Sequence, residues 1–243
     1  MEALEYILED SVNNMLGGSS SSRTTFFPSL SSLIIEQCPN LKGWWRNSTE
    51  DDDVNEPHHL LLPSFPHRLS QLKILGCPNL TCMPLFPYLK EELTLDGASL
   101  KELEQGMEMK AKMGAATTST SSSSSSCYFP LSRLKSLWLK NVNHLESLPK
   151  EWLWKLISLQ KPDIESWDGL DSLPWIANLK SLQFLRIWSC PNLTLLPQEI
   201  RNLTSLQSLE IFFCSPLLRI RCQRQTVADW PIIAHVTCVI VFI

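Results

Sequence analysis

The sequence predicts a repeat solenoid of the α/β class, in which a curved parallel β-sheet forms the concave face and short helical or irregular segments form the convex face. Leucine is in excess, with 41 copies among 243 residues, of which 44% are apolar. An apolar motif, Leu-x-x-Leu-x-Leu/Ile-x-x-Cys, recurs along the chain, and most neighbouring copies lie 21 to 25 residues apart. Self-similarity at a period of roughly 20–50 residues is typical of repeat architectures.

Seven copies of the motif predict seven strands. Four copies are clear and end in cysteine, and three of these continue as Cys-Pro-Asn-Leu, from Cys38, Cys77 and Cys190. Alternation buries one face of a strand only, so no repeat covers its own leucines, and neighbours must stack about 4.8 Å apart. The last apolar strand position of each copy is, in order, Ile35, Ile74, Leu95, Leu139, Ile164, Ile187 and Ile211.

Two longer gaps between these anchors, of 39 and 44 residues, coincide with an acidic run at 50–53 and a Ser/Thr tract at 117–126. Such composition predicts unstructured inserts, at about 44–66 and 104–127. For the serine run a flexible linker is favoured over a phosphorylation site. The predicted organisation is a partial N-terminal repeat and Ser-rich linker at 1–26, the leucine-rich-repeat solenoid at 27–221, and a capping segment around Trp230 at 222–243.

Proline marks the path of the chain after each strand. A second signal, Leu-x-x-Leu-Pro, recurs at 145–149, 170–174 and 193–197, and the following residues 198–203 are expected to form a short, partly helical return segment. Pro162 instead replaces a strand leucine and cannot donate a ladder hydrogen bond. We expect a weakened or bulged strand there, with Trp167 filling the lost volume.

Composition and charge exclude several classes of partner. The net charge is −4 and the pI about 5.8, whereas nucleic-acid binders usually carry a basic patch. The short cluster of Arg219, Arg221 and Arg224 is interpreted as a solvated tail face. The sequence contains neither a secretory signal nor an apolar run of about 18–20 residues, so we expect a cytoplasmic protein with no membrane span.

No catalytic, metal or cofactor site is predicted. His58, His59 and His67 lie near Cys77 and Cys82, but without the spacing of a zinc site. Neither a Gly-x-Ser-x-Gly elbow nor a phosphate-binding Gly-x-x-x-x-Gly-Lys-Ser/Thr loop occurs. The repeat cysteines are interpreted as buried thiols rather than disulfides. Two Asn-x-Ser/Thr sequons, at Asn79 and Asn192, fall in the Cys-Pro-Asn-Leu phrase, where a structural role accounts for them.

Binding is expected instead on strand residues that point away from the leucines, since these line one shared surface. Exposed aromatic residues are enriched at protein interfaces, which favours a protein-binding stripe toward the C-terminal end, centred on Arg186 and Trp188. The alternative is that inserts or crossing side chains cover these aromatic residues. The predicted binding residues are Trp138, Lys140, Phe184, Arg186, Trp188, Glu210 and Phe212.

The segment Leu193–Cys214, with its Leu-Pro-x-x-Ile-x-Asn-Leu phrase, and the tail Cys222–His235 resemble the end of the repeat region of plant nucleotide-binding leucine-rich-repeat disease-resistance proteins. The resemblance extends from about Phe27 onward. It implies non-enzymatic recognition in immune defence, with a pathogen effector, a guarded host protein or a nucleotide-binding domain as partner. The family's phosphate-binding loop has no counterpart here.

Three alternatives stay open. The chain could be the substrate-binding adaptor of a ubiquitin ligase, which would be expected to carry a recruiting motif outside the repeats. It could be an extracellular receptor-type repeat protein, which would be expected to carry a signal peptide and Gly-x-Ile-Pro phrases. It could also be a truncated, non-functional fragment of a disease-resistance protein. The sequence shows neither a recruiting motif outside the repeats nor a signal peptide with Gly-x-Ile-Pro phrases.

Overall fold

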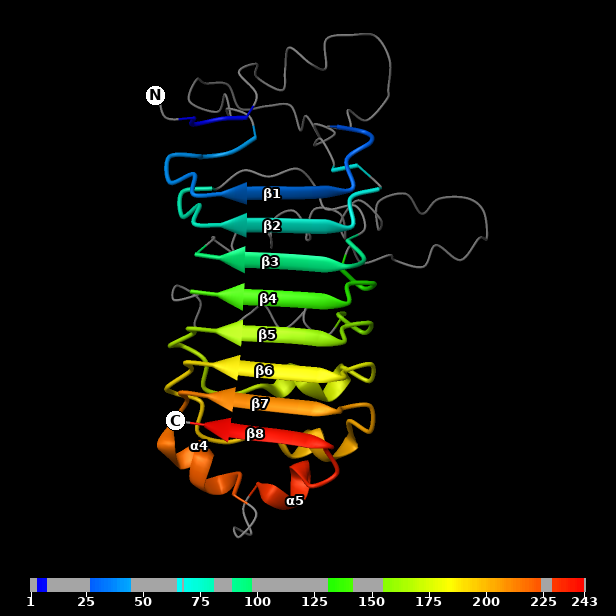
Figure 1. Cartoon of the computed structure of the whole chain (residues 1–243), viewed down its shortest axis with the longest axis vertical. Coiled ribbons are helices and arrows are strands. Elements are labelled where there is room, and N and C mark those ends of the chain that lie inside the picture. The colour runs from blue at the N-terminus through cyan, green and yellow to red at the C-terminus, as the bar shows by residue number, and fades with distance from the viewer. Residues whose placement is uncertain are drawn as a thin grey trace, which may run out of the picture.

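The computed structural model describes residues 4–7, 27–44, 65–66, 68–80, 89–97, 131–141, 155–223 and 229–242. Within these residues one parallel sheet of eight strands follows the order of the chain (Figure 1). This arrangement is that of a leucine-rich-repeat solenoid. The strands are β1 (Ser32–Glu36), β2 (Gln71–Leu75), β3 (Glu92–Asp96), β4 (Ser136–Lys140), β5 (Lys161–Glu165), β6 (Phe184–Trp188), β7 (Ser208–Phe212) and β8 (Cys238–Phe242).

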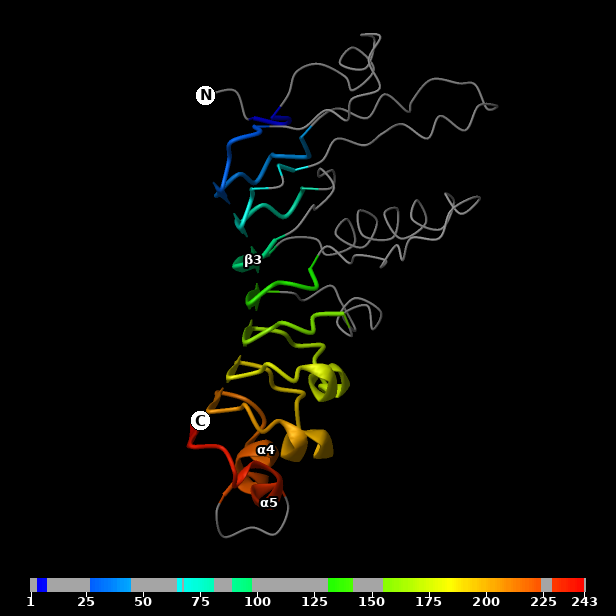
Figure 2. The same cartoon turned by 90° about the vertical axis from the view of Figure 1, so that its right-hand side faces the viewer.

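The strands form because apolar and polar residues alternate over five positions. In β2, Leu72 and Ile74 are fully buried, whereas the flanking residues are partly exposed. Strand register aligns these positions from repeat to repeat, so that the apolar residues of neighbouring strands form one continuous core. All seven predicted anchors occupy the fourth position of β1 to β7, as expected. Figure 2 shows the sheet on one side and the helical segments on the other.

Each of the strands β1 to β7 is followed by a residue with positive φ, between 52° and 63°. The backbone N–H of that residue donates to the carbonyl of the last residue of the next strand, at 2.9 to 3.1 Å. The sheet ladder therefore continues one step beyond each strand while the chain turns inward. The residues are Gln37, Gly76, Gly97, Asn141, Ser166, Ser189 and Phe213.

The Cys-Pro-Asn-Leu phrase then joins neighbouring repeats. Asn79 Nδ2 donates to the carbonyl of Pro39 at 2.7 Å, and Asn192 Nδ2 donates to the carbonyl of Asp168 at the same distance. Each asparagine thus satisfies a backbone acceptor of the preceding repeat. The structural role predicted for Asn79 and Asn192 is confirmed.

Pro162 shortens one ladder without bulging its strand. β5 keeps five residues and pairs fully with β4, but only its last three residues pair with β6. The N–H groups of a parallel strand point alternately to either side, and Ser166 N–H donates to Trp188 on β6. The missing N–H of Pro162 would have pointed the same way. Trp167 is buried in the core two residues beyond β5.

The return segments are short on the convex side. The two that the structure describes in full are 3₁₀ helices, η1 (Pro174–Asn178) and η2 (Gln198–Asn202), each placed after a Leu-x-x-Leu-Pro signal. Their buried isoleucines, Ile176 and Ile200, extend the core behind the sheet. The prediction of a partly helical return at 198–203 is confirmed.

The tail contains a strand that the sequence analysis missed. Helices α4 (Pro216–Arg221) and α5 (Trp230–Ile233) precede β8, which pairs with β7 over five residues. Arg221 Nη2 lies 2.7 Å from Asp229 Oδ1, and Asp229 is fully buried. The interpretation of Arg221 as part of a solvated face is therefore wrong, because it neutralises a buried carboxylate. Arg224 lies outside the described residues.

The first described residues, 4–7, lie beside the turn that follows β1. Tyr6 forms a parallel bridge with Gly43, and Lys42 Nζ lies 3.0 Å from Glu5 Oε2. The acidic and Ser/Thr runs of the predicted inserts lie outside the described residues, as do the three histidines. No helix in the described ranges is long and apolar enough to cross a membrane.

Candidate protein-binding surface

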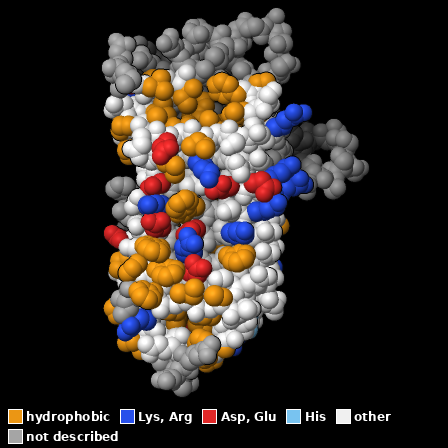
Figure 3. All heavy atoms as spheres, viewed as in Figure 1, with side chains coloured by type: hydrophobic (Ala, Val, Ile, Leu, Met, Phe, Trp, Pro, Cys, Tyr) orange, Lys and Arg blue, Asp and Glu red, His pale blue; other side chains and the backbone are white. Residues whose placement is uncertain are grey.

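The concave face consists of the side chains at the first, third and fifth positions of each strand. Its central band carries charged groups, and apolar side chains lie above and below that band (Figure 3). The structure places all seven predicted binding residues on this face, on β4, β6 and β7. Their role in binding stays a prediction.

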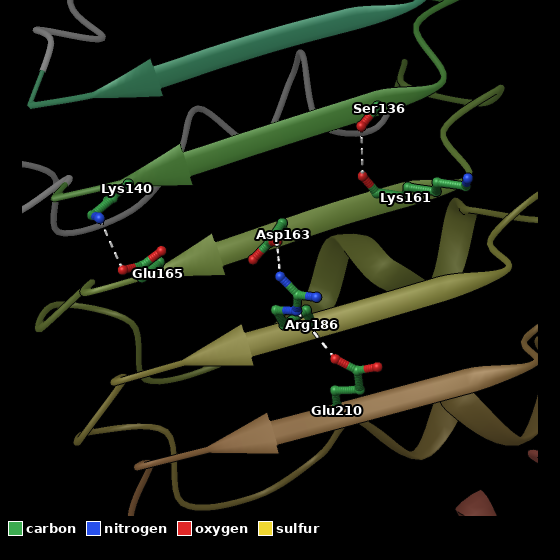
Figure 4. A network of polar contacts seen from close by, with 7 residues as sticks. All are labelled: Ser136, Lys140, Lys161, Asp163, Glu165, Arg186 and Glu210. Atoms are coloured by element: carbon green, nitrogen blue, oxygen red, sulfur yellow. Dashed lines mark hydrogen bonds and ion pairs between the residues drawn. The ribbon is translucent and has the colours of Figure 1, made fainter. Parts of the chain in front are cut away.

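Charged side chains of the central band neutralise one another across neighbouring strands. Arg186 bridges two carboxylates, with Nη1 3.0 Å from Asp163 Oδ2 and Nε 3.1 Å from Glu210 Oε2 (Figure 4). Lys140 Nζ lies 3.1 Å from Glu165 Oε1. These contacts join residues about one repeat apart in sequence, which the strand register makes direct neighbours.

Asp163 lies at the floor of a hollow of about 350 Å³ that spans β3 to β7. Burial raises the pKa of its carboxyl, an effect that the neighbouring Arg186 guanidinium opposes. Its Oδ1 is buried without a hydrogen-bond partner, as is Nε1 of Trp138 on the paired strand. The hollow therefore holds incompletely satisfied polar groups beside apolar walls, including Phe184.

Aromatic residues gather where β6 and β7 end. The Trp188 ring contacts those of both Phe212, at a centroid distance of 4.9 Å, and Phe213, at 5.1 Å. Trp188 keeps 36% of its surface exposed and Phe213 48%. We call these three residues the aromatic cluster. Phe184 is 40% exposed, and Lys161 Nζ lies 5.2 Å from its ring centroid.

Trp188 and Phe184 are exposed, so other side chains do not cover these two aromatic residues. One residue of the same face is covered by its neighbours. Thr94, expected to point outward, is 1% exposed, because its short side chain lies between the longer side chains of Lys73 and Trp138 in register.

Three exposed apolar residues at the C-terminal end of the concave face were missed. Phe213 follows β7 and joins the face only through its positive φ, which a strand-period analysis does not detect. Ile240 and Phe242, 40% and 63% exposed, lie on β8, in the tail that was predicted as a cap. The short run of apolar, mostly β-branched and aromatic residues Cys-Val-Ile-Val-Phe was a signal that could have found them.

The described part of the chain holds no group of three or more His, Cys, Asp or Glu side chains placed to bind a metal. The hollow on the concave face and a second hollow among α4, α5 and β8 are both partly open to solvent. The concave face is suited to contact with another macromolecule.

No family model matches the sequence, and a search of curated proteins finds no significant relative. Among solved structures, the chain is similar to an internalin from Listeria monocytogenes, at 14% sequence identity and a TM-score of 0.38. The match covers 88% of this chain and 61% of the internalin chain. The chain thus spans less than two thirds of that protein.

Proposed function

We propose that this protein is a non-enzymatic recognition module that binds a protein partner on the C-terminal half of its concave face. The observation that carries the proposal is the exposure of the aromatic cluster beside the Asp163–Arg186–Glu210 network. Aromatic and arginine side chains dominate the binding energy of protein interfaces. A partner that covers Trp188 and Phe213 would remove apolar surface from water.

The charged network sets the orientation of the partner. Asp163 and Glu210 together carry two negative charges against the one positive charge of Arg186. A partner residue with a positive charge would complement this excess, while apolar partner residues contact the aromatic cluster. Electrostatic complementarity of this kind contributes mainly to specificity and to the rate of association.

Within this function, we propose a cytoplasmic role in plant immune recognition. The support is the resemblance of Leu193–Cys214 and of the tail to the repeat region of nucleotide-binding disease-resistance proteins. The partner would then be a pathogen effector, a guarded host protein or a nucleotide-binding domain. A ubiquitin-ligase adaptor and a non-functional fragment are the alternative functions.

Site-specific photo-crosslinking tests the surface directly. The photoreactive residue p-benzoylphenylalanine replaces Phe213 in one variant and Ile157, an exposed residue outside the strands, in another. In extract from pathogen-challenged leaves, we expect the variant at position 213 to form a discrete adduct and the variant at position 157 to form none. Mass spectrometry of the adduct identifies the partner as an immune protein or as a ligase subunit.

The double substitution Trp188→Ser and Phe212→Ser should abolish the adduct at position 213 while the far-UV circular dichroism stays unchanged. Ile157→Ser with Leu195→Ser is the matched control, since both residues are exposed and lie outside the strands. Loss of folding without a separate binding defect would show that Trp188 and Phe212 are structural and would contradict the proposed surface.

A further inference from the structure

Two thiols of neighbouring repeats lie side by side directly behind the aromatic cluster. Cys190 follows β6 and Cys214 follows β7, each two residues after the strand end. Trp188 and Phe212, the strand-end residues, are paired in register, and the same positive-φ turn follows both. The two cysteines therefore occupy equivalent positions in adjacent turns of the solenoid.

The hydrogen bonds of the two sulfur atoms show how the thiols are directed. Cys190 Sγ lies 3.5 Å from the carbonyl oxygen of Trp188, and Cys214 Sγ lies 3.3 Å from that of Phe212. Cys214 Sγ is also 3.9 Å from the carbonyl oxygen of Ile187, which belongs to β6. The Cys214 thiol thus leans toward the repeat that contains Cys190.

This spacing suits a covalent bond. Adjacent strands are about 4.8 Å apart, and the Cα atoms of disulfide-bonded cysteines are about 4.4–6.8 Å apart. Both thiols are free in this structure. Because the strands before them are paired in register, a bond between the two cysteines would require no change in that register.

The two thiols differ in exposure and in acidity. Cys190 is fully buried, whereas Cys214 is partly exposed. The neighbouring Cys190 thiol lowers the pKa of the Cys214 thiol, whereas the neighbouring Cys214 thiol and burial raise the pKa of Cys190. A reactive cysteine needs thiolate character and access to solvent, and a neighbouring thiol can then resolve its oxidised form. Cys214 has the lowered pKa and the access to solvent, and Cys190 is the neighbouring thiol.

We propose that Cys190 and Cys214 form an oxidation site, at which a hydroperoxide converts the two thiols to an intramolecular disulfide. The Cys214 thiolate attacks one peroxide oxygen, the O–O bond breaks, and a sulfenic acid forms as hydroxide leaves. The Cys190 sulfur then attacks the Cys214 sulfur, the S–O bond breaks, and the departing hydroxide takes the Cys190 proton. In total, two thiols lose two electrons and hydrogen peroxide is reduced to two water molecules.

A second stacked pair in the same chain provides an internal comparison. Cys38 and Cys77 hold the equivalent positions after β1 and β2, where Cys38 is partly exposed and Cys77 buried. Their sulfur atoms contact carbonyl groups of their own repeats, Glu36 and Leu75. The pKa of the Cys77 thiol is raised mainly by burial and also responds to Cys38, so the two pairs are alike in their stacking. They differ in that the Cys38 and Cys77 sulfur atoms have no contact with a carbonyl of the neighbouring strand, among the described residues, like the 3.9 Å approach of Cys214 Sγ to Ile187. We therefore expect this pair to link less readily.

The experiment treats the whole folded chain with increasing hydrogen peroxide, alkylates the remaining thiols, and maps the peptides by mass spectrometry. The expected product joins the peptide of Cys190 to that of Cys214 in the monomer, with the loss of two hydrogen masses. Its fraction should exceed that of a Cys38–Cys77 link at every peroxide concentration. Dithiothreitol should reverse the change.

Two variants test whether the link depends on Cys214 itself rather than on the loss of any buried thiol. Cys214→Ser should abolish the link and leave Cys190 free for alkylation after unfolding, whereas Cys222→Ser, which removes another buried thiol, should leave it intact. Near-UV circular dichroism shows whether each variant keeps the native packing. The proposal is overturned if Cys214 of the wild-type chain accumulates as sulfenic or sulfinic acid with Cys190 unmodified. It is equally overturned if Cys38 and Cys77 link more readily.

Discussion

A left-handed residue follows each of the first seven strands, yet the side chains at these seven positions have little in common. Glycine occupies two positions, and asparagine, serine, glutamine and phenylalanine the others. The conformation recurs because the solenoid turn requires it and because each N–H completes the ladder to the next strand. Non-glycine residues are strained there by about 1–2 kcal/mol. The repeat as a whole imposes this strain on its individual residues.

Substitution of Gly97 by alanine isolates that strain. Gly97 has a φ of +63°, and a Cβ atom built there meets nothing within 4 Å, so the change creates no clash. We expect the free energy of unfolding to fall by about 1 kcal/mol, because alanine disfavours the left-handed region. The midpoint of urea unfolding measures this loss. Ser189→Gly, at an equivalent position, should raise the midpoint, and an unchanged midpoint in both variants would contradict the argument.

At the scale of the element, the strand β5 shows how one proline reduces the hydrogen-bonded pairing of an interior strand. The pairing of β5 with β6 loses two positions relative to the other strand pairs, and the core position of Pro162 stays buried. Pro162→Leu should restore an N–H donor toward β6 and stabilise the fold by about 1 kcal/mol. Hydrogen exchange should show the new amide at position 162 protected like that of Ile164.

The reverse change provides the control, since Leu137 holds the corresponding position on β4. Leu137→Pro should remove one ladder bond toward β5 and lower the unfolding midpoint. If the amide of Pro162→Leu exchanged freely and the midpoint fell, the larger side chain would not fit between the neighbouring strands. The missing N–H of Pro162 would then not be what limits the stability of β5.

The strands were predictable because burial of alternate residues is a local pattern that repeats. Seven anchors and the concave positions of Trp138, Arg186 and Trp188 follow from that period alone. The strand β8 escaped detection because valine occupies the two positions that leucine and isoleucine hold in β7, the strand paired with it. Phe213 escaped because a backbone dihedral angle, not a period, brings it to Trp188. The ion pairs of Arg186 with Asp163 and Glu210 could be predicted only with the register of the neighbouring strands known.

At the scale of the whole molecule, stability is distributed along the stack. Each strand pairs only with its neighbours, so local terms and nearest-neighbour contacts determine which part opens first. At the C-terminal end the buried Asp229 carboxylate accepts hydrogen bonds from Arg221 and from the backbone N–H of Leu196. These bonds connect the segment that leads to β8 with the preceding repeats.

In the variant Asp229→Ala, the strand β8 at the end of the sheet should therefore open before the strands in the middle. Removing the buried carboxylate leaves the buried N–H of Leu196 without its acceptor, which costs about 1–3 kcal/mol. Hydrogen exchange should show lost protection in β8 and at the amide of Phe213, which donates to Phe242, while β4 and β5 stay protected. Glu5→Ala, which breaks an exposed pair, should change the stability by less than about 1 kcal/mol. Equal loss of protection in all strands would mean that the sheet opens as one unit, since nearest-neighbour coupling predicts a gradient from the damaged end.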